Sequence, residues 1–400
     1  MISLLAIVAC SNDLTPNTIQ ENEAEYYFET SNNTHFVSMH NAIDSAFSIL
    51  ENNTTRSADR IIKSCEIYTP LANTRSSDYE VSFYLINFEN NKGYALVSTD
   101  DRATPVYLFA EEGNISVTDI ENNQFISMFF ESAIPNYVAE IEIYEEDITY
   151  NSIITDIIPP HLLYLPTVFL DGKAYFCKTI TEIITTTPMV YAYWHQSYPY
   201  NKYAGPYTGC GINSVGQIMS YHQFPTTYHN STYDWDLINQ QSSYTEECPA
   251  SNMIAQLMYD MGDYLDVDYG ASGTGTTNED SRNLFIEFGY TCSQITNYTA
   301  NTSYIIESEI DNNRPIWIRG DDNGGVGHAW VIDGYKRTEI IKEYYQKISP
   351  YALYRTTRDI LSTYYRCIWG LTNDYMPVYC LRTEFYLPDN IKFLYNIKPR

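Results

Sequence analysis

The chain has 400 residues, enough for two domains that each bury a core of their own. Acidic residues outnumber basic ones by 50 to 23, which gives a net charge of −27 at pH 7. This charge argues against nucleic acid or an anionic membrane as the main partner, because both would repel the protein.

The first ten residues resemble an export signal. Ile2–Ala9 is an apolar run too short to span a membrane, and the sequence Ile-Val-Ala-Cys that ends at Cys10 resembles a bacterial lipobox. No Lys or Arg precedes this run, so an apolar tail without a signal function stays an alternative. We predict a lipoprotein-type signal over residues 1–10 and a polar tether over 11–34. The protein would then be extracytoplasmic, either an outer-membrane lipoprotein anchored through Cys10 or a secreted protein.

Residues 35–160 are predicted to form a small α+β unit. Ser38 is a suitable N-cap, and apolar residues follow it at helical spacing. An alternating run then predicts a strand: Val81, Phe83 and Leu85. The Pro159-Pro160 pair marks the end of this unit, and a second domain is predicted over residues 165–400.

The eight cysteines are spread along the chain and form no CxxC pair. No Cys/His cluster has the spacing of a zinc site, so we expect neither a metal nor another cofactor. The cysteines are too sparse for a disulfide scaffold, and we interpret most of them as buried thiols. A bridge between Cys367 and Cys380 stays open.

Cys210 lies between Gly209 and Gly211, at the start of an apolar pattern with helical spacing. We predict a helix that begins at Cys210 and ends by Pro225, since proline cannot continue a helix. The thiol would then lie at the positive end of the helix dipole, which lowers a thiol pKa and favours the reactive thiolate. The alternative is a small cysteine buried in the core.

A nucleophilic thiolate needs a base, and His328 is the candidate. It stands in the sequence GGVGHAWVIDGY, where glycines precede it and a strand is predicted directly after it. His222 lies on the same predicted helix as Cys210, but three turns away and too far to touch it. Candidate donors for the oxyanion of acyl transfer are the backbone N–H of Cys210 and the side chain of Gln196, with His195 as a competitor.

Several motifs follow one another between residues 185 and 379: TTPMVYAYWHQSYPYN, TGCGINSVGQIMSYHQFP, YDWDLI, MIAQLMYDMGDYLDVDYGASGTGT and GVGHAWVIDGY. Together they resemble the streptopain family of bacterial cysteine peptidases. The resemblance implies a papain-like α+β fold, with Cys210 as the nucleophile, His328 as the base and Gln196 in the oxyanion hole. It also implies substrate-binding positions: Gly209, Ser272, Gly273, Gly327 and Trp369.

The N-terminal unit carries a resemblance of its own. The segments VSMHNAIDSAF and YLINFENNKGYALVSTDDRATPVYLFAEEG are similar to the inhibitory prodomain of the same family. The resemblance implies that residues 35–160 inhibit the catalytic domain at 165–400. The other partners it implies are protein or peptide substrates.

The sequence departs from the Asn-Trp-Gly-Trp motif that the family has after the histidine. Ile368 stands where the family has Asn, and Leu371 stands where it has the second Trp. The family's Asn side chain can hydrogen-bond the catalytic imidazole, so Asn373 or Asp374 is a candidate substitute if the following loop folds back. The segment 336–365 also looks like a long insertion.

The favoured interpretation is an extracytoplasmic cysteine endopeptidase made as a zymogen, which hydrolyses peptide bonds through a Cys-His dyad. One alternative, supported by Ile368, is a weak or silent homologue that binds peptides or a partner protein. Another is an acyltransferase that uses the same dyad with an amine acceptor.

Overall fold

The structure is a computed structural model of the whole chain. The residues it describes are 35–50, 60–70, 81–123, 126–127, 130, 134, 137–142, 167–170, 173–270, 274–299, 301–321, 327–346, 349–371, 377–382 and 391–400. They form both helices and strands, which confirms the expected α+β class. Among the helices described, none has the length and apolar character needed to cross a membrane. The predicted signal and tether, with Cys10, lie outside the described residues.

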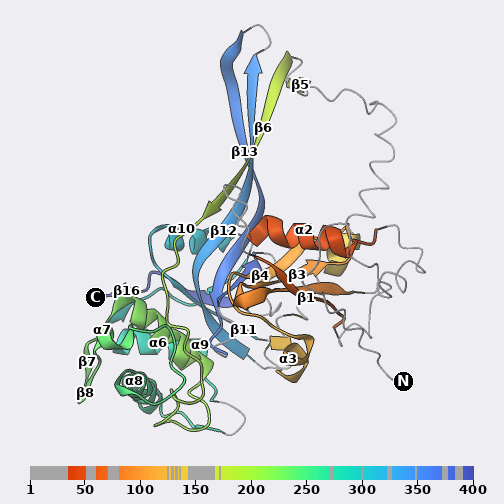
Figure 1. Cartoon of the computed structure of the whole chain (residues 1–400). Helices are drawn as coiled ribbons and strands as arrows, with labels where there is room; N and C mark the ends of the chain where they lie inside the picture. The colour runs from red at the N-terminus through yellow and green to blue at the C-terminus, as the bar shows by residue number, and fades with distance from the viewer. Residues whose placement is uncertain are drawn as a thin grey trace.

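The N-terminal unit is an antiparallel sheet with helices packed on it. Its elements are α2 (Met39–Leu50), β1 (Ile62–Tyr68), β2 (Phe83–Phe88), β3 (Tyr94–Ser98), β4 (Val106–Ala110) and α3 (Val117–Asn122). The hydroxyl of Ser38 accepts a hydrogen bond of 3.3 Å from the backbone N–H of Asn41, which confirms the predicted N-cap of α2. In Figure 1, α2 lies along the sheet formed by these strands.

Strand β2 is buried on both faces, which the alternation of its apolar residues does not indicate. Phe83 and Leu85 lie in the larger hydrophobic core of the molecule. Tyr84, Ile86 and Phe88 point the other way, into a second core that α2 completes. A strand covered on both sides has no solvent-facing positions, so its polar–apolar alternation is weak.

The C-terminal unit is built around helix α6. Its helices are α6 (Cys210–His222), α7 (Trp235–Ile238), α8 (Pro249–Leu265), α9 (Asn278–Glu287) and α10 (Ser303–Asp311). Its longer strands are β5 (Thr167–Leu170), β6 (Lys173–Thr185), β11 (Ile316–Asp321), β12 (Gly327–Gln346), β13 (Ser349–Ile368), β14 (Val378–Leu381) and β15 (Lys392–Leu394). Two-residue strands complete it: β7 (Thr227–Tyr228), β8 (Ser231–Thr232), β9 (Tyr290–Thr291), β10 (Thr296–Asn297) and β16 (Lys398–Pro399). Residues 211–220 of α6 are all buried, because β11 and β12 contact it as well as α8 and α9.

The two units share one sheet. Within the described residues its strand order is β1-β2-β3-β4-β14-β13-β12-β11-β15-β10. Strands β4 and β14 form the junction, where Phe109 lies opposite Tyr379 and the two rings stack with 4.8 Å between centroids. The ammonium group of Lys336 also crosses the junction and donates a hydrogen bond to the backbone carbonyl of Ile49. The N-terminal unit is therefore docked on the C-terminal unit through main chain and side chains.

Strands β12 and β13 extend beyond the body of the molecule as a long arm (Figure 1). The first part of β12, residues 327–332, pairs with β11, and the second part, 336–346, pairs with β6. Strand β13 follows β12 along both parts. The predicted insertion at 336–365 therefore forms most of this arm, and the third strand of the arm comes from β6, far away in the sequence.

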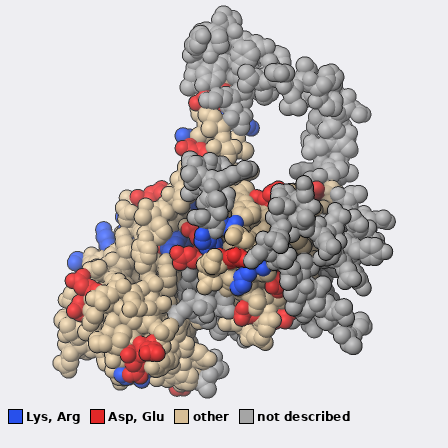
Figure 2. All heavy atoms as spheres, in the orientation of Figure 1, with Lys and Arg blue, Asp and Glu red and all other residues tan. Residues whose placement is uncertain are grey.

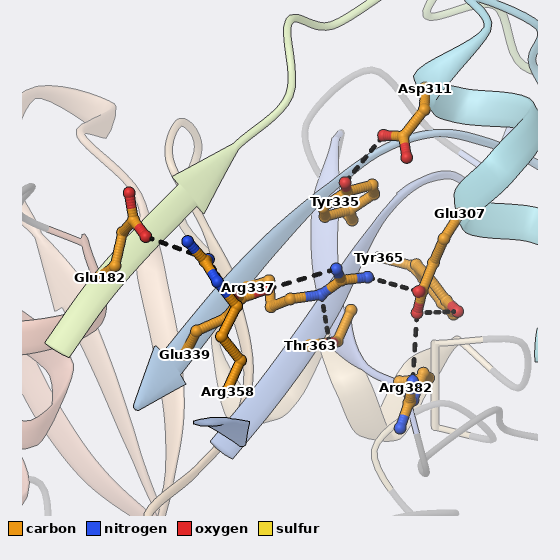
Figure 3. A network of polar contacts seen from close by, with 10 residues as sticks. All are labelled: Glu182, Glu307, Asp311, Tyr335, Arg337, Glu339, Arg358, Thr363, Tyr365 and Arg382. Carbon is orange, nitrogen blue, oxygen red and sulfur yellow. Dashed lines mark hydrogen bonds and ion pairs between the residues drawn. The ribbon is translucent and has the colours of Figure 1, made fainter. Parts of the chain in front are cut away.

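An ionic network connects the base of the arm to α10 (Figure 3). The carboxylate of Glu307 on α10 accepts hydrogen bonds from Arg337 on β12, from Arg382 at 3.1 Å and from the Tyr365 hydroxyl at 3.2 Å. Figure 3 shows further contacts in this network: Tyr335 with Asp311, and Arg358 with Glu182 and Glu339. Because both arm strands and α10 contribute, the arm is fixed at its base.

Acidic and basic side chains lie close together on the face that Figure 2 shows. Lys and Arg atoms lie beside Asp and Glu atoms where the arm meets the body and in small groups on the helical unit, with uncharged surface between them. The described part of this face therefore has no continuous basic surface of the kind that binds nucleic acid.

Candidate active site

Cys210 is the first residue of α6, as the sequence predicts. Gly209 precedes it with φ of 96°, a left-handed conformation that favours glycine. Gly211 follows it in tight packing, because a Cβ there would lie 2.2 Å from the hydroxyl oxygen of Thr276. The two glycines therefore fix the chain at the start of the helix, where backbone N–H groups are available to an anion.

The Cys210 thiol lies against strand β12. Burial raises the pKa of Cys210, while a hydrogen bond from the backbone N–H of Ala329, the positive charge of Arg319 and the N–H of Gly211 act in the opposite direction. The net pKa is raised, so the thiol is mainly protonated in this form of the chain, which includes the N-terminal unit. Ala329 directly follows His328, so the two predicted catalytic residues lie at the same place.

His328 is 1% exposed and lies near the start of β12. Its Nε2 lies 2.7 Å from the backbone carbonyl oxygen of Trp369, which can only accept a hydrogen bond. Nε2 therefore carries the proton, and Nδ1 is the basic nitrogen. Burial lowers the pKa of His328 to about 4, and the bond to Trp369 offsets part of this effect, whereas the charge of Arg319 adds to it. The imidazole is thus neutral at physiological pH and can accept a proton.

The hydrogen bond that orients the His328 imidazole is made by the backbone carbonyl of Trp369. From the sequence alone, this bond is expected to come from the side chain of an Asn or Asp. Ile368 is fully buried in the hydrophobic core and pairs with Val331 on β12, so it has no part in orienting the imidazole. Asn373 and Asp374, the predicted substitutes, lie outside the described residues. A backbone carbonyl is present whatever the residue, and no sequence motif could have revealed this contact.

We expect Ile368→Asn to lower stability without raising kcat/KM for peptide hydrolysis. The Nε2 proton of His328 already has an acceptor in Trp369, and a buried amide without partners costs about 1–3 kcal/mol. Steady-state kinetics and urea unfolding would be compared with Ile368→Val, which keeps the site apolar. An increase in kcat/KM of about fivefold or more over Ile368→Val would show that the imidazole lacks an adequate acceptor.

The segment that carries Gln196 is fastened to α6. The carbonyl of Trp194 accepts hydrogen bonds from the side-chain amides of Asn213 at 2.9 Å and Gln217 at 3.0 Å. The carbonyl of Gln196 accepts a bond of 2.9 Å from the backbone N–H of Thr208, two residues before Cys210. Gln196 is therefore held close to the start of α6 with its side chain half-buried. Asn213 and Gln217 hold this segment, a role that helical periodicity does not indicate.

Of the other predicted substrate positions, the structure describes Gly327 and Trp369. Thr274 is fastened to the segment before Cys210, because its hydroxyl donates a bond of 2.6 Å to the carbonyl of Tyr207. Ser272 and Gly273 lie outside the described residues. Gly327 immediately precedes His328 on β12. The Trp369 side chain is 4% exposed and packs on Trp330, with 4.9 Å between ring centroids, so its contact with substrate stays a prediction.

Neither Cys367 nor Cys380 takes part in a disulfide bond. These two lie on adjacent strands, where Cys367 pairs with Val378 and Cys380 pairs with Tyr365. The bridge that the sequence left open is therefore not formed. Among the described residues, no group of three or more His, Cys, Asp or Glu side chains has the arrangement of a metal site.

Comparison with known proteins gives the family. Residues 194–347 match the Peptidase C10 family, and residues 21–133 match the Spi protease inhibitor. Streptopain of Streptococcus pyogenes is 28% identical over 290 residues, which cover 63% of this chain and 68% of streptopain. Streptopain of serotype M1 is 28% identical over 287 residues, with the same coverage. A solved fragment of prointerpain A from Prevotella intermedia aligns with a TM-score of 0.49 and 18% identity, over 83% of this chain and 98% of the fragment. The chain therefore carries a Peptidase C10 domain, that of the streptopain family, preceded by a Spi protease inhibitor region.

Proposed function

We propose that this protein is a cysteine endopeptidase that is made as a zymogen. The observation that carries the proposal is the position of the Cys210 thiol, at the start of α6 and against the backbone N–H of the residue that follows His328. Nδ1 of His328 takes the thiol proton, and Sγ attacks the scissile carbonyl carbon. The backbone N–H of Cys210 and the side chain of Gln196 stabilise the resulting oxyanion.

The rest of the reaction uses the same proton and one water molecule. His328 returns the proton to the leaving amine as the C–N bond breaks, which leaves a thioester on Cys210. His328 then takes a proton from water, and the hydroxide attacks the thioester. The C–S bond breaks, the product with its new carboxylic acid leaves, and the proton on His328 returns to Sγ of Cys210. The bond from Nε2 to the Trp369 carbonyl keeps Nδ1 as the reacting nitrogen throughout.

The N-terminal unit is proposed to inhibit this reaction in the precursor. Its match to the Spi protease inhibitor and the sheet it shares with the C-terminal unit support this role. Strand β6 pairs with β12 over residues 175–185, so we propose that processing occurs before β6 and leaves that strand in the arm. We further propose that the protein acts outside the cytoplasm, on protein or peptide substrates; its lipid anchor at Cys10 stays a prediction.

Cutting the chain between the two units should increase peptide hydrolysis. A recognition site for a specific protease, placed between residues 160 and 165, would allow the cut to be made in the folded protein. Phe109→Ala should increase the rate further after the cut, because it removes the stack on Tyr379 at the junction. Phe47→Ala is the matched control, since Phe47 packs on Phe88 within the N-terminal unit.

The rate is measured with a fluorogenic peptide before and after the cut. Equal rates in both states would refute inhibition by the N-terminal unit. Equal increases in Phe109→Ala and Phe47→Ala would show that the β4–β14 junction does not hold the inhibitor in place.

A further inference from the structure

Arg319 lies on the face of β11 that packs against α6. Trp317, two residues earlier on this strand, donates a hydrogen bond of 2.8 Å from Nε1 to the hydroxyl of Ser214 on α6. Residues two apart on a strand share a face and lie about 6.6 Å apart, and four residues of helix span about 6 Å. Ser214 comes four residues after Cys210, and the charge of Arg319 acts on the Cys210 thiol, so Arg319 lies toward the Cys210 end of α6.

The guanidinium of Arg319 joins two segments that flank the site. Nη1 donates a hydrogen bond to the backbone carbonyl of Thr276, at the end of the loop where the family resemblance places substrate. Nε and Nη2 donate to Oδ1 of Asp321 at 3.0 and 2.9 Å. Only 17% of the Arg319 side chain is exposed, so the group is held in one position with restricted access to water.

The glycines next to both catalytic candidates lie against this same group. A Cβ at Gly327, which precedes His328, would lie 2.1 Å from Oδ1 of Asp321 and 2.4 Å from Nη2 of Arg319. A Cβ at Gly211, which follows Cys210, would meet the hydroxyl of Thr276. The backbone next to His328 therefore packs on Arg319 and Asp321, and the backbone next to Cys210 packs on Thr276.

We propose that Arg319 is a positioning residue of the active site, which holds the Thr276 and Asp321 segments and provides a permanent positive charge for the Cys210 thiolate. The proposal rests on the proposed function, in which Cys210 is the nucleophile. Arg319 on β11 would then act on Cys210 and His328 through its charge and its contacts, without taking part in the bond changes itself.

The charges around Cys210 support this role. The first turn of α6 contains no acidic residue, Asp321 faces Arg319 on β11, and His328 lies on β12. The positive charge of Arg319 lowers the pKa of both the Cys210 thiol and the His328 imidazole. It therefore favours a thiolate beside a neutral imidazole and disfavours protonation of His328. Asp321 reduces this effect, because its carboxylate neutralises part of the guanidinium charge.

The test measures the alkylation of Cys210 by iodoacetamide against pH in the full-length chain, with mass spectrometry to identify the modified residue. Alkylation becomes faster as the pH rises through the pKa of Cys210, and we call this rise the acid limb of the profile. Arg319→Gln should move the acid limb to higher pH by about 1 unit, so that alkylation at a pH below the limb is about tenfold slower. Arg319→Lys keeps the charge, so its limb should stay within about 0.3 pH units of wild type. Asp321→Asn should move the limb down, because the charge of Arg319 is then no longer offset.

Two controls accompany these variants. Arg314→Gln removes an arginine that pairs with Glu309 instead, and should leave the Cys210 profile unchanged. Cys248 provides an internal control, since its thiol is hydrogen-bonded to Ser251 at the start of α8. Circular dichroism and thermal melting check that each variant is folded; if Arg319→Gln does not fold, Asp321→Asn decides alone.

Opposite shifts in Arg319→Gln and Asp321→Asn support the proposal. Unchanged limbs, or shifts in the same direction, overturn it. No substrate is used, so an absence of peptidase activity would refute the proposed function without affecting this result.

Discussion

Cys210→Ser should lower peptide hydrolysis by at least about a thousandfold, because the serine hydroxyl ionises far less readily than a thiol and is a poorer nucleophile here. The substitution changes one atom in a half-buried side chain at the start of α6, so the fold should be kept. Initial rates with a fluorogenic peptide, measured on the chain cut between its two units, give the size of the effect.

Cys292→Ser is the matched control for this variant. Cys292 is also half-buried, and burial raises the pKa of its thiol, but it directly follows β9 and its thiol faces the carbonyl of Arg282 on α9. The Cys292→Ser variant should hydrolyse the peptide at the wild-type rate. Full activity in Cys210→Ser would exclude Cys210 as the nucleophile.

Arg366→Met should destabilise the protein by about 3–5 kcal/mol, because it leaves a buried carboxylate without its positive partner. The side chains of Arg366 and Asp333 are 4% and 0% exposed, and their closest contact is 2.6 Å. Asp333 also accepts hydrogen bonds from the backbone N–H groups of Met189 at 3.0 Å and Val190 at 2.7 Å. The pair therefore connects β12 and β13 to the segment that leads to Gln196.

Urea unfolding monitored by tryptophan fluorescence measures this loss. Lys342→Met is the control, because Lys342 and Asp359 form an exposed pair at 3.9 Å on β12 and β13 that contributes less than about 1 kcal/mol. Adding Asp333→Asn to Arg366→Met should recover part of the stability, since the buried charge is then removed. If Arg366→Met is no less stable than Lys342→Met, the pair of Arg366 and Asp333 does not anchor this part of the fold.

Helix α6 was predictable because its signals are local. The glycines around Cys210, the apolar residues at helical spacing and Pro225 set its limits, and the structure places it at Cys210–His222. The N-cap at Ser38 is another local signal of this kind. Periodicity and capping depend on neighbours in the sequence, so they can be read before the fold is known.

The contacts that decide the site depend on the tertiary fold. The Trp369 carbonyl, which holds His328, has no side-chain signature. The burial of Arg319 follows from the position of β11 against α6, and nothing in its local sequence distinguishes it from an exposed arginine. The arm was recognised only as an insertion, since its third strand, β6, lies about 150 residues earlier in the chain than the strand with which it pairs.

Cys210 is proposed to be the reactive thiol of a peptidase. A test of this proposal must distinguish Cys210 from Cys248, the thiol with the lower pKa. Burial raises the pKa of the Cys248 thiol, but hydrogen bonds from Ser251 and Ala250 outweigh this effect and leave it lowered, whereas that of Cys210 is raised. General thiol reactivity would therefore favour Cys248. Recognition of a substrate-like peptide would favour Cys210, because its thiol lies against the backbone N–H of Ala329, the residue that follows His328.

The measurement is stoichiometric labelling of the cut chain with a peptidyl acyloxymethyl ketone, followed by peptide mapping and a residual-activity assay on the same sample. Our account predicts one label for each chain, located on Cys210, with peptide hydrolysis lost in proportion to labelling. Labelling at Cys248, or an unlabelled Cys210 in a chain that hydrolyses nothing, would contradict it and would favour a silent homologue that binds peptides or a partner protein.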